Sequence, residues 1–396
     1  MLIDCDFHIH SKYSGATSKN MDLENISRQG KLKGLNLIGT GDALHKLWLE
    51  ELKTLKEFSD GIYKKNDVFF IVTTEVEDIR RVHHLILLPD ISSAESLRES
   101  LQRYSKDLDS DGRPKVGLSG EEIAEIVSEV QGLLGPAHAF VPWTSIYKEY
   151  DSLAQCYGDS LRKIKFLELG LSADSELADY IAEVKDLTFL SNSDAHSPWP
   201  HRLGREFNRL KVTEVTFKEI EKAIERRAGN KVVLNVGLDP RLGKYHATSC
   251  IKCYKHYTLE EAIKLNWRCR CGGIIKKGVK DRIKELASYS KPKHPEHRPP
   301  YLRIAPLAEI LCMSLNVSNV YSQKVQAMWK KLVGRFGSEI AVLVDIPIPE
   351  IRKEFGDEIA FYIDAFRKEN FDIKEGGGGK YGRIVFIKEQ YSLDDF

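Results

Sequence analysis

Residues 2–10 read Leu-Ile-Asp-Cys-Asp-Phe-His-Ile-His, a run that predicts a β-strand followed by two histidines. Because side chains alternate between the two faces of a strand, His8 and His10 point the same way and can bind one metal ion together. A similar pair follows the apolar run at 187–190, where Asp194 and His196 are also separated by one residue. Two such pairs predict a metal-binding active site.

Short apolar runs alternate with helical patterns as far as about Val236. The runs that predict buried strands lie at 35–38, 68–72, 84–88, 132–137, 164–169 and 187–190. Ser119 with Glu122, and Thr216 with Glu219, fit capping boxes, so each pair predicts the start of a helix. This alternation predicts an α/β fold, most simply a barrel or a distorted barrel.

Catalytic groups in such folds lie where strands end, and the sequence places histidines and carboxylates there. These residues are His8, His10, Asp42, Glu75, His138, Glu168, Asp194 and His196. A donor set of this kind, without cysteine, favours catalytic zinc or manganese over a closed structural site. A glutamate between two ions would let one ion hold hydroxide while the other receives a phosphate oxygen, which favours phosphoester hydrolysis. A single histidine at a strand end is more often structural than a metal ligand. The prediction therefore depends on the recurrence of such residues at several strand ends.

These residues resemble the motifs of the polymerase-and-histidinol-phosphatase (PHP) phosphoesterases. The matching segments are 6–11, 40–42, Glu75, 84–87, 137–138 and 192–196. The resemblance implies a distorted (β/α)7 barrel with two or three divalent metal ions, Zn2+, Mn2+ or Mg2+. It implies His8, His10, Glu75 and Asp194 as ligands of the first ion, Glu75, His84 and His138 of the second, and Asp42 and His196 of a third.

Two positions depart from the PHP pattern. Ala16 lies where the family often has a histidine, and the second motif reads Asp42-Ala43-Leu44-His45 in place of an adjacent Asp-His pair. The third metal site is therefore the least complete, and His45 is a candidate substitute ligand. His83 and His84 are neighbours on a predicted strand and must face opposite ways. We assign His84, rather than His83, as the metal ligand, because the residues after it match the family better.

A second motif pairs Cys250-Ile-Lys-Cys253 with Cys269-Arg-Cys271 after fifteen intervening residues. Two thiolate pairs at this spacing predict a tetrahedral zinc site, and four cysteines favour a structural role over a catalytic one. The other three cysteines, Cys5, Cys156 and Cys312, lie in apolar surroundings and are expected to be buried thiols without chemistry.

Positive charge is concentrated around this motif. Residues 244–303 contain ten lysines and five arginines against five acidic residues, although the whole chain has a formal net charge of only +1. Clustered cations beside a phosphoesterase centre predict binding to a nucleic-acid backbone, whereas the alternative is a solvated charged surface. The expected DNA-binding cations of this module are Lys252, Lys255, Arg268, Arg270, Lys276 and Lys277.

The composition changes again after the linker-like stretch 290–300. Helical patterns follow at 305–314, 321–336, 348–354 and 357–369. The glycine-rich stretch 375–383 lacks the spacing of a P-loop. It is either a DNA-contacting loop or a hairpin turn before 384–387, and we favour the turn. The chain therefore divides into a PHP domain at 1–238, an inserted or following four-cysteine domain at 239–298 and a small, mainly helical C-terminal domain at 299–396.

The overall composition, 42% hydrophobic and 30% charged over 396 residues, is typical of a globular protein of two or three domains. The sequence has no run long enough to cross a bilayer and no secretory signal pattern, so we expect a cytoplasmic protein without membrane contact. Zinc-bound thiolates fit such a reduced compartment better than disulfides do.

The three-part organisation resembles the endonuclease Q family of DNA-repair enzymes along essentially the whole chain, including segments 11–21 and 197–205. The resemblance implies recognition of uracil, hypoxanthine, xanthine and abasic sites in double- or single-stranded DNA, with hydrolysis of the phosphodiester 5′ to the lesion. The expected catalytic residues are Asp194, Glu75, His10 and Arg205.

Exposure of a damaged base calls for groups that hold the DNA open. Arg202 and Arg205 are candidate phosphate clamps, the alternative being an ordinary helix-surface pair. Trp143 and Trp199 are the better candidates for stacking on a base; Trp48 and Tyr147 are weaker ones, and core packing is the alternative for each.

Two other functions stay open at this level. A PHP phosphomonoesterase similar to histidinol phosphatase would use the same metal centre on a small substrate, and a DNA-binding adaptor would have lost catalysis. The sequence also leaves open whether a sliding clamp is a partner and how many chains assemble.

Overall fold

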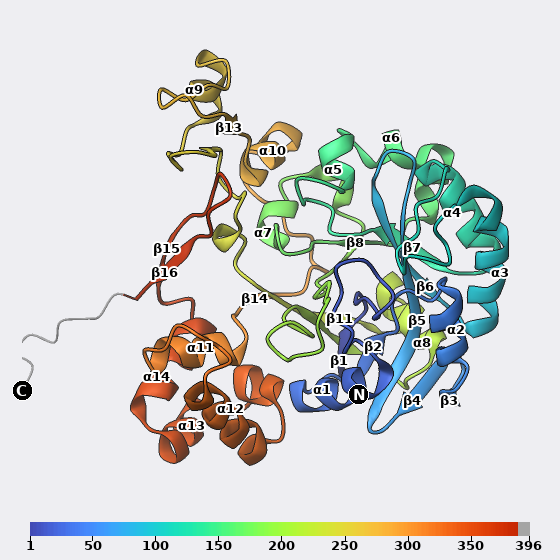
Figure 1. Cartoon of the computed structure of the whole chain (residues 1–396), viewed down its shortest axis with the longest axis horizontal. Helices are drawn as coiled ribbons and strands as arrows, with labels where there is room; N and C mark the ends of the chain where they lie inside the picture. Colours follow the sequence, from blue (N-terminus) through green and yellow to red (C-terminus); the bar gives the residue numbers. More distant parts are fainter. Residues whose placement is uncertain (387–396) are drawn as a thin grey trace, which may run out of the picture.

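The computed structural model describes residues 1–386, which form a barrel with two smaller parts beside it (Figure 1). Twelve strands build the barrel and its extensions. They are β1 (Leu2–Asp6), β2 (Leu37–Gly39), β3 (Lys56–Ser59), β4 (Ile62–Lys65), β5 (Val68–Glu77), β6 (His83–Leu88), β7 (Leu133–Pro136), β8 (Phe166–Glu168), β9 (Thr188–Leu190), β10 (Phe207–Lys211), β11 (Lys231–Gly237) and β14 (Tyr301–Arg303). Each of the six predicted buried strands overlaps an observed one.

The strand order is β14-β11-β10-β1-β2-β5-β4-β3, and β6 pairs with both β5 and β7. β8 pairs with β9 in parallel. Isolated bridges complete the circuit, because Leu134 on β7 pairs with Ile164 ahead of β8, and Ala195 after β9 pairs with Ile9 after β1. The sheet mixes parallel pairs such as β1–β2 with antiparallel pairs such as β5–β6. The predicted distorted α/β barrel is thus confirmed.

Helices cover the outside of the barrel (Figure 1). They are α1 (Leu23–Lys33), α2 (Lys46–Leu52), α3 (Ile91–Leu101), α4 (Gly120–Glu129), α5 (Ile146–Glu149), α6 (Leu153–Tyr157), α7 (Ser175–Ala178) and α8 (Phe217–Glu225). The capping box predicted at Ser119 is complete, since Ser119 and Glu122 bond each other's backbone. At the start of α8 only half of the box forms. Thr216 caps the helix, whereas Glu219 bonds Thr213, Lys222 and Asn230.

The four-cysteine module, residues 244–286, projects from the barrel (Figure 1). It contains β12 (Ser249–Cys250), α9 (Leu259–Lys264), β13 (Ile275–Lys276) and α10 (Val279–Leu286). Its own buried cluster is small and includes two of the cysteines: Cys250, Tyr257, Ala262, Cys269 and Ile275. A core of this size is too small to stabilise a fold alone, and a metal ion between the cysteines would add the missing stability.

The C-terminal region consists of α11 (Leu307–Ser314), α12 (Gln323–Phe336), α13 (Ile348–Phe355) and α14 (Asp357–Arg367), close to the four predicted helices. Its apolar core is continuous with that of the barrel. The stretch expected to be a linker is instead docked on the barrel. Arg298 bonds Asp179 at 2.9 Å and is almost fully buried, and His294 contacts the same carboxylate at 2.7 Å.

Two strands, β15 (Asp372–Lys374) and β16 (Arg383–Val385), form the glycine hairpin, residues 372–385. The predicted hairpin turn is confirmed, although Ile387, expected in its second strand, lies outside the described residues. Among residues 1–386, none of the helices combines the length and apolar character that a membrane crossing requires.

Candidate metal centre

His8 and His10 follow β1, and their rings lie edge to face 5.3 Å apart. A carboxylate contacts the Nδ1 atom of each ring and so fixes the orientation of that ring. Glu168 contacts His8 Nδ1 at 2.9 Å, and Asp42 contacts His10 Nδ1 at 2.9 Å. Since Nδ1 is occupied on both rings, Nε2 is the atom that each histidine presents to the centre. Carboxylates commonly orient metal-binding histidines in this way.

Glu75 lies in the middle of the cluster and is buried. Its Oε1 is 2.8 Å from His83 Nδ1, 2.9 Å from His138 Nε2 and 3.6 Å from His8 Nε2. Its Oε2 is 3.4 Å from His10 Nε2. The two oxygens therefore face two different sets of histidines, as a bridging ligand requires.

Asp194 closes the other side of the centre. Its Oδ1 lies 3.1 Å from His10 Nε2, 3.8 Å from His8 Nε2 and 3.7 Å from His196 Nδ1. Asp6, which is fully buried, positions this segment by accepting hydrogen bonds from the backbone of Ser193 and Gly204. Asp42, His138 and Asp194 all have positive φ angles, of 51°, 31° and 47°. Left-handed backbone at three residues of one cluster is typical of functional sites.

Three overlapping groups of donors meet here. They are His8 with His10 and Glu75, His10 with Asp194 and His196, and Glu75 with His83 and His138. His8 Nε2, His10 Nε2 and Asp194 Oδ1 are buried and accept or donate no hydrogen bond among the described residues. Buried polar atoms without partners cost about 1–3 kcal/mol each, which divalent cations bound between them would remove. The donor set therefore fits a multinuclear metal site.

His83, rather than the predicted His84, belongs to this centre. In the β5–β6 pair, His83 lies opposite Glu77, and Glu75 and Glu77 share one face of β5. His84 lies opposite Val76 and points to the other face, where its ring contacts Asp78 at 3.2 Å and the Tyr157 hydroxyl at 2.9 Å. The assignment of His84 to the second metal is thus wrong.

Asp42 also differs from its predicted role as a metal ligand. One of its oxygens contacts His10 Nδ1, and the other accepts the backbone N–H of Ser11 at 2.5 Å. Both oxygens are engaged, so Asp42 orients His10 and holds the loop after β1. The substitute ligand considered for the third site, His45, stacks on Tyr13 at 4.5 Å between ring centroids and is absent from the donor groups.

Sequence reasoning missed Arg113, whose Nη1 lies 3.5 Å from Glu75 Oε2. It lies on a loop between α3 and α4, where neither periodicity nor a motif marks it. Glu168 was noted only as a strand-end residue. It contacts His8 Nδ1 and accepts hydrogen bonds from the His138 backbone and the Asn192 amide. Arg113 thus adds a cation to the centre, and Glu168 ties two metal motifs together.

The electrostatics of the centre follow from these contacts. Burial alone raises the pKa of Glu75, but the nearby His83 and His8 outweigh burial and hold that pKa well below its ordinary value. Burial likewise lowers the pKa of His8, whereas Glu168 and Glu75 outweigh it and raise the pKa. Glu75 is therefore ionised, as a carboxylate ligand of a metal ion must be.

Arg205, a predicted phosphate clamp, lies beside the Asp194 segment, where its Nε donates to the Ser193 carbonyl at 3.1 Å. Arg202 is exposed on the same loop, and Trp199 is half-buried there. Trp48 and Tyr147 belong to the core instead. The Trp48 indole N–H donates to the Gly41 carbonyl at 2.8 Å, and the Tyr147 hydroxyl donates to Glu183 at 2.8 Å. Neither residue can stack on DNA.

The four cysteines of the predicted zinc site converge, with all four sulfurs within 4.8 Å of one another. Cys250 Sγ is 3.5 Å from Cys271 Sγ, and Cys253 Sγ is 3.5 Å from Cys269 Sγ. Of the remaining cysteines, Cys5 and Cys156 are buried as predicted, whereas Cys312 is only half-buried. Burial raises the pKa of Cys156 well above its ordinary value, which keeps this thiol protonated and unreactive.

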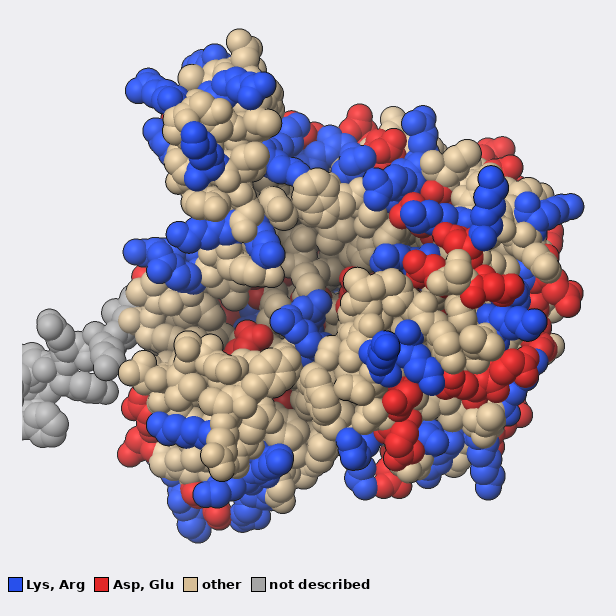
Figure 2. All heavy atoms as spheres, in the orientation of Figure 1, with Lys and Arg blue, Asp and Glu red and all other residues tan. Residues whose placement is uncertain are grey.

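The module presents cations on the face seen in Figure 2, whereas acidic and basic side chains alternate over the barrel. Lys252, Lys255, Arg268 and Arg270 are exposed. Lys276 and the exposed Trp143 form one group, with the ammonium 3.2 Å from the indole ring centroid. Lys277 differs from these residues, because Glu285 binds its ammonium at 2.5 Å.

We expect replacement of His83 and of His84 by alanine to have different effects. His83→Ala should remove a metal ligand and lower activity at least a hundredfold with a small change in melting temperature. His84→Ala should leave Asp78 Oδ2 and the Tyr157 hydroxyl without the His84 ring as a partner, which costs about 1–3 kcal/mol of stability, and should keep the metal content. Elemental analysis of bound metal and thermal unfolding of both variants measure the contrast. Loss of metal from the His84→Ala variant, with metal retained in His83→Ala, would contradict this prediction.

Glu206 gives the structure a distinct pH dependence. Burial raises its pKa to about 8, and its Oε1 accepts the Leu238 N–H at 2.9 Å. The pKa in the folded state is above the unfolded value, so the stability present below about pH 4.5 is lost as the pH rises through 8. We expect Glu206→Gln to remove this loss, on the order of 4 kcal/mol. Thermal unfolding from pH 5 to 9 tests it, with exposed Glu129→Gln as the control.

A crystal structure of the lesion-specific endonuclease PfuEndoQ from Pyrococcus furiosus is 53% identical to this chain, with a TM-score of 0.95. The match covers 100% of this chain and 98% of that one. The chain belongs to the endonuclease Q family. A second endonuclease Q structure, bound to a 27-mer duplex with an abasic lesion at the active site, matches 100% of both chains at 53% identity and a TM-score of 0.92.

The chain is also similar to part of a longer protein. The protein MJ0043 of Methanocaldococcus jannaschii is 48% identical over 270 residues, which are 65% of this chain and 33% of that protein. The chain thus matches about a third of the length of that relative. The family model of the MJ0043 C-terminal domain matches residues 306–370, which contain α11 to α14 of this chain.

Proposed function

We propose that this protein is a metal-dependent, lesion-specific DNA endonuclease. The observation that carries the proposal is the cluster in which Glu75 faces two sets of histidines, with Asp194 closing the far side. The family relationship supports the substrate class, because one endonuclease Q structure holds duplex DNA with an abasic lesion at its active site. The cationic four-cysteine module beside the barrel supports the same substrate, since such a surface attracts a phosphate backbone.

The residues that would hold the active-site ions are assigned as follows. His8, His10, Glu75 and Asp194 would hold a first ion, and Glu75, His83 and His138 a second. His196, beside His10 and Asp194, would complete a third site. Imidazole and carboxylate donors favour zinc or manganese over magnesium. The four cysteines would hold a structural zinc ion.

The chemistry divides between the ions and the protein. Bound divalent ions supply a hydroxide nucleophile at neutral pH and neutralise charge on the phosphate. Glu168 and Asp42 keep the His8 and His10 rings in one tautomer, so their Nε2 atoms stay available. Arg113 lies beside Glu75, and Arg205 beside the Asp194 segment, where guanidinium groups can hold the oxygens of the scissile phosphate.

Lesion recognition would require the damaged base to leave the helix. Extrusion costs a few kcal/mol and least where damage has already weakened pairing, so uracil, hypoxanthine, xanthine and abasic sites share one physical feature. Trp199 on the loop after Asp194 and Trp143 beside Lys276 are the aromatic side chains placed to contact the opened DNA. The nick is expected 5′ to the lesion.

Incubation with labelled 40-mer duplexes tests the proposal. Each duplex carries one uracil, hypoxanthine or abasic site, an undamaged duplex serves as the control, and Mn2+, Mg2+ and Zn2+ are tested in turn. We expect one nick at the 5′ side of the lesion and none in the control. Hydrolysis of p-nitrophenyl phosphate without nicking under any condition would indicate a phosphomonoesterase and contradict the proposal.

A further inference from the structure

The glycine hairpin contacts the four-cysteine module through its backbone. The Ala247 N–H donates to the Gly376 carbonyl at 3.0 Å, and the Gly379 N–H donates to the Lys244 carbonyl at 3.0 Å. A Cβ atom on Gly377 would lie 2.1 Å from Ser249 Oγ, and one on Gly378 would lie 2.4 Å from the Cys250 carbonyl oxygen. The glycine run is therefore required for close packing of the hairpin against the strand that carries the first zinc-type ligand.

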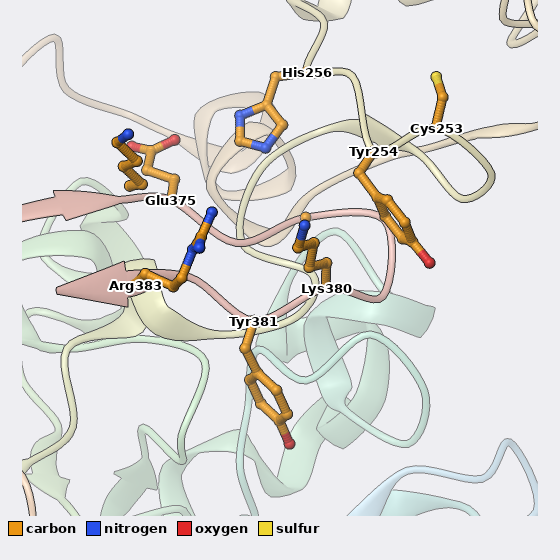
Figure 3. A pocket seen from close by; sticks show the side chains of 9 residues that line it. Cys253, Tyr254, His256, Glu375, Lys380, Tyr381 and Arg383 are labelled. Atoms are coloured by element: carbon orange, nitrogen blue, oxygen red, sulfur yellow. The ribbon is translucent and has the colours of Figure 1, made fainter. Parts of the chain in front are cut away.

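A pocket of about 510 Å3 lies between these two parts (Figure 3). Tyr254 and His256 reach it from the module, and Lys380, Tyr381 and Arg383 reach it from the hairpin. Cys253, Lys374, Glu375 and Gly377 complete the lining. Both tyrosines are unusually exposed for aromatic side chains, at 44% for Tyr254 and 65% for Tyr381. Neither the metal centre nor the packing of the core uses them.

The charge around the pocket is positive. Lys280 binds the Glu375 carboxylate, which is the acidic group in the lining. Lys380 Nζ lies 5.5 Å from the centroid of the Tyr254 ring, and Lys244 Nζ lies 4.6 Å from that of Tyr381. Each tyrosine is thus accompanied by an ammonium group. Alternation of cations and exposed aromatic rings is the arrangement that binds phosphates and stacked bases of a single strand.

Resting on the proposed function, we propose that this pocket binds a single-stranded segment of the DNA substrate. Tyr254 and Tyr381 stack on unpaired bases, and Lys380 and Arg383 hold the phosphates between them. The pocket is separate from the metal centre and belongs to a different pair of elements. An enzyme that opens a duplex at a lesion creates unpaired nucleotides, and this second site would hold them away from their partner strand.

Fluorescence anisotropy of a labelled dT12 oligonucleotide with the full chain tests the proposal. We expect Tyr254→Ala and Tyr381→Ala each to weaken binding about fivefold to a hundredfold, and Tyr381→Phe, which keeps the ring, to bind as the unaltered chain does. Lys380→Gln and Arg383→Gln should each lower the slope of log affinity against log salt by about 0.7. Lys218→Gln on α8, far from the pocket, is the matched control for charge.

Two results would overturn the proposal. One is dT12 affinity within twofold of the unaltered chain in both tyrosine-to-alanine variants. The other is an equal loss of affinity for polyphosphate in the same variants. Polyphosphate is a polyanion without bases, so this result would indicate a loss of structure or of general charge. Nicking is measured separately on the damaged duplexes. A chain that binds dT12 through its tyrosines and never nicks DNA would contradict the proposed function alone.

Discussion

Asp194→Ala is expected to abolish nicking of lesion-bearing DNA. The Asp194 carboxylate lies 3.1 Å from His10 Nε2 and 3.8 Å from His8 Nε2, so it faces the donors of two proposed metal sites. Metal ions contribute several kcal/mol to transition-state stabilisation, and each 1.4 kcal/mol is tenfold in rate. We therefore expect the rate of nicking to fall at least a thousandfold. Single-turnover assays on a uracil-containing duplex measure the fall.

Asp194→Asn is the matched control for the backbone. Asp194 has a φ of 47°, a conformation that Asn tolerates better than Ala. The amide fits the same space but provides no anionic ligand, so Asn should inactivate the enzyme as fully as Ala does. Both variants should stay folded and retain the zinc ion that we propose for the four-cysteine module. Full activity in Asp194→Asn would mean that backbone geometry, rather than the carboxylate, explains the loss in Asp194→Ala.

Local patterns were sufficient to predict the ligands at strand ends. Residues two positions apart lie on the same face of any strand. This spacing alone places His8 with His10, and Asp194 with His196, on a common face. The convergence of the four cysteines was predictable for a similar reason, since two closely spaced pairs at this separation are typical of a four-sulfur metal site. In both cases the information lies within a few consecutive residues.

The choice between His83 and His84 depended instead on how two strands pair. Local alternation shows only that the two histidines face opposite ways. The register of β6 against β5 decides which of them lies on the face of Glu75, and that register is set by the turn 78–82. Arg113 was missed because a loop residue reaches the centre through tertiary packing alone. The role of Asp42 was misassigned because a carboxylate that orients a ligand has the same sequence signature as a ligand.

The second large effect is expected at the junction between the barrel and the C-terminal helices. Lys33 at the end of α1 and Glu339 after α12 form an ion pair at 2.7 Å, with side-chain exposures of 1% and 0%. Lys33 also donates to the Pro200 carbonyl at 2.9 Å, on the loop after the Asp194 motif. Glu339 accepts the Leu307 N–H at 3.1 Å and the Trp329 indole N–H at 2.6 Å. This one carboxylate therefore connects the two parts.

Glu339→Ala should destabilise the chain by about 3–5 kcal/mol, because it leaves a buried ammonium without a counter-charge. The double variant Lys33→Met with Glu339→Gln removes both charges and keeps an amide oxygen for the N–H donors, so it should lose about 1–2 kcal/mol. Urea unfolding of the single and double variants measures the difference. Equal losses would mean that neither the unpaired ammonium nor the missing N–H acceptor carries a penalty, and would contradict the prediction. A larger loss in Glu339→Ala is the expected result, because only that variant leaves both the Lys33 ammonium without a counter-charge and the two N–H donors without an acceptor.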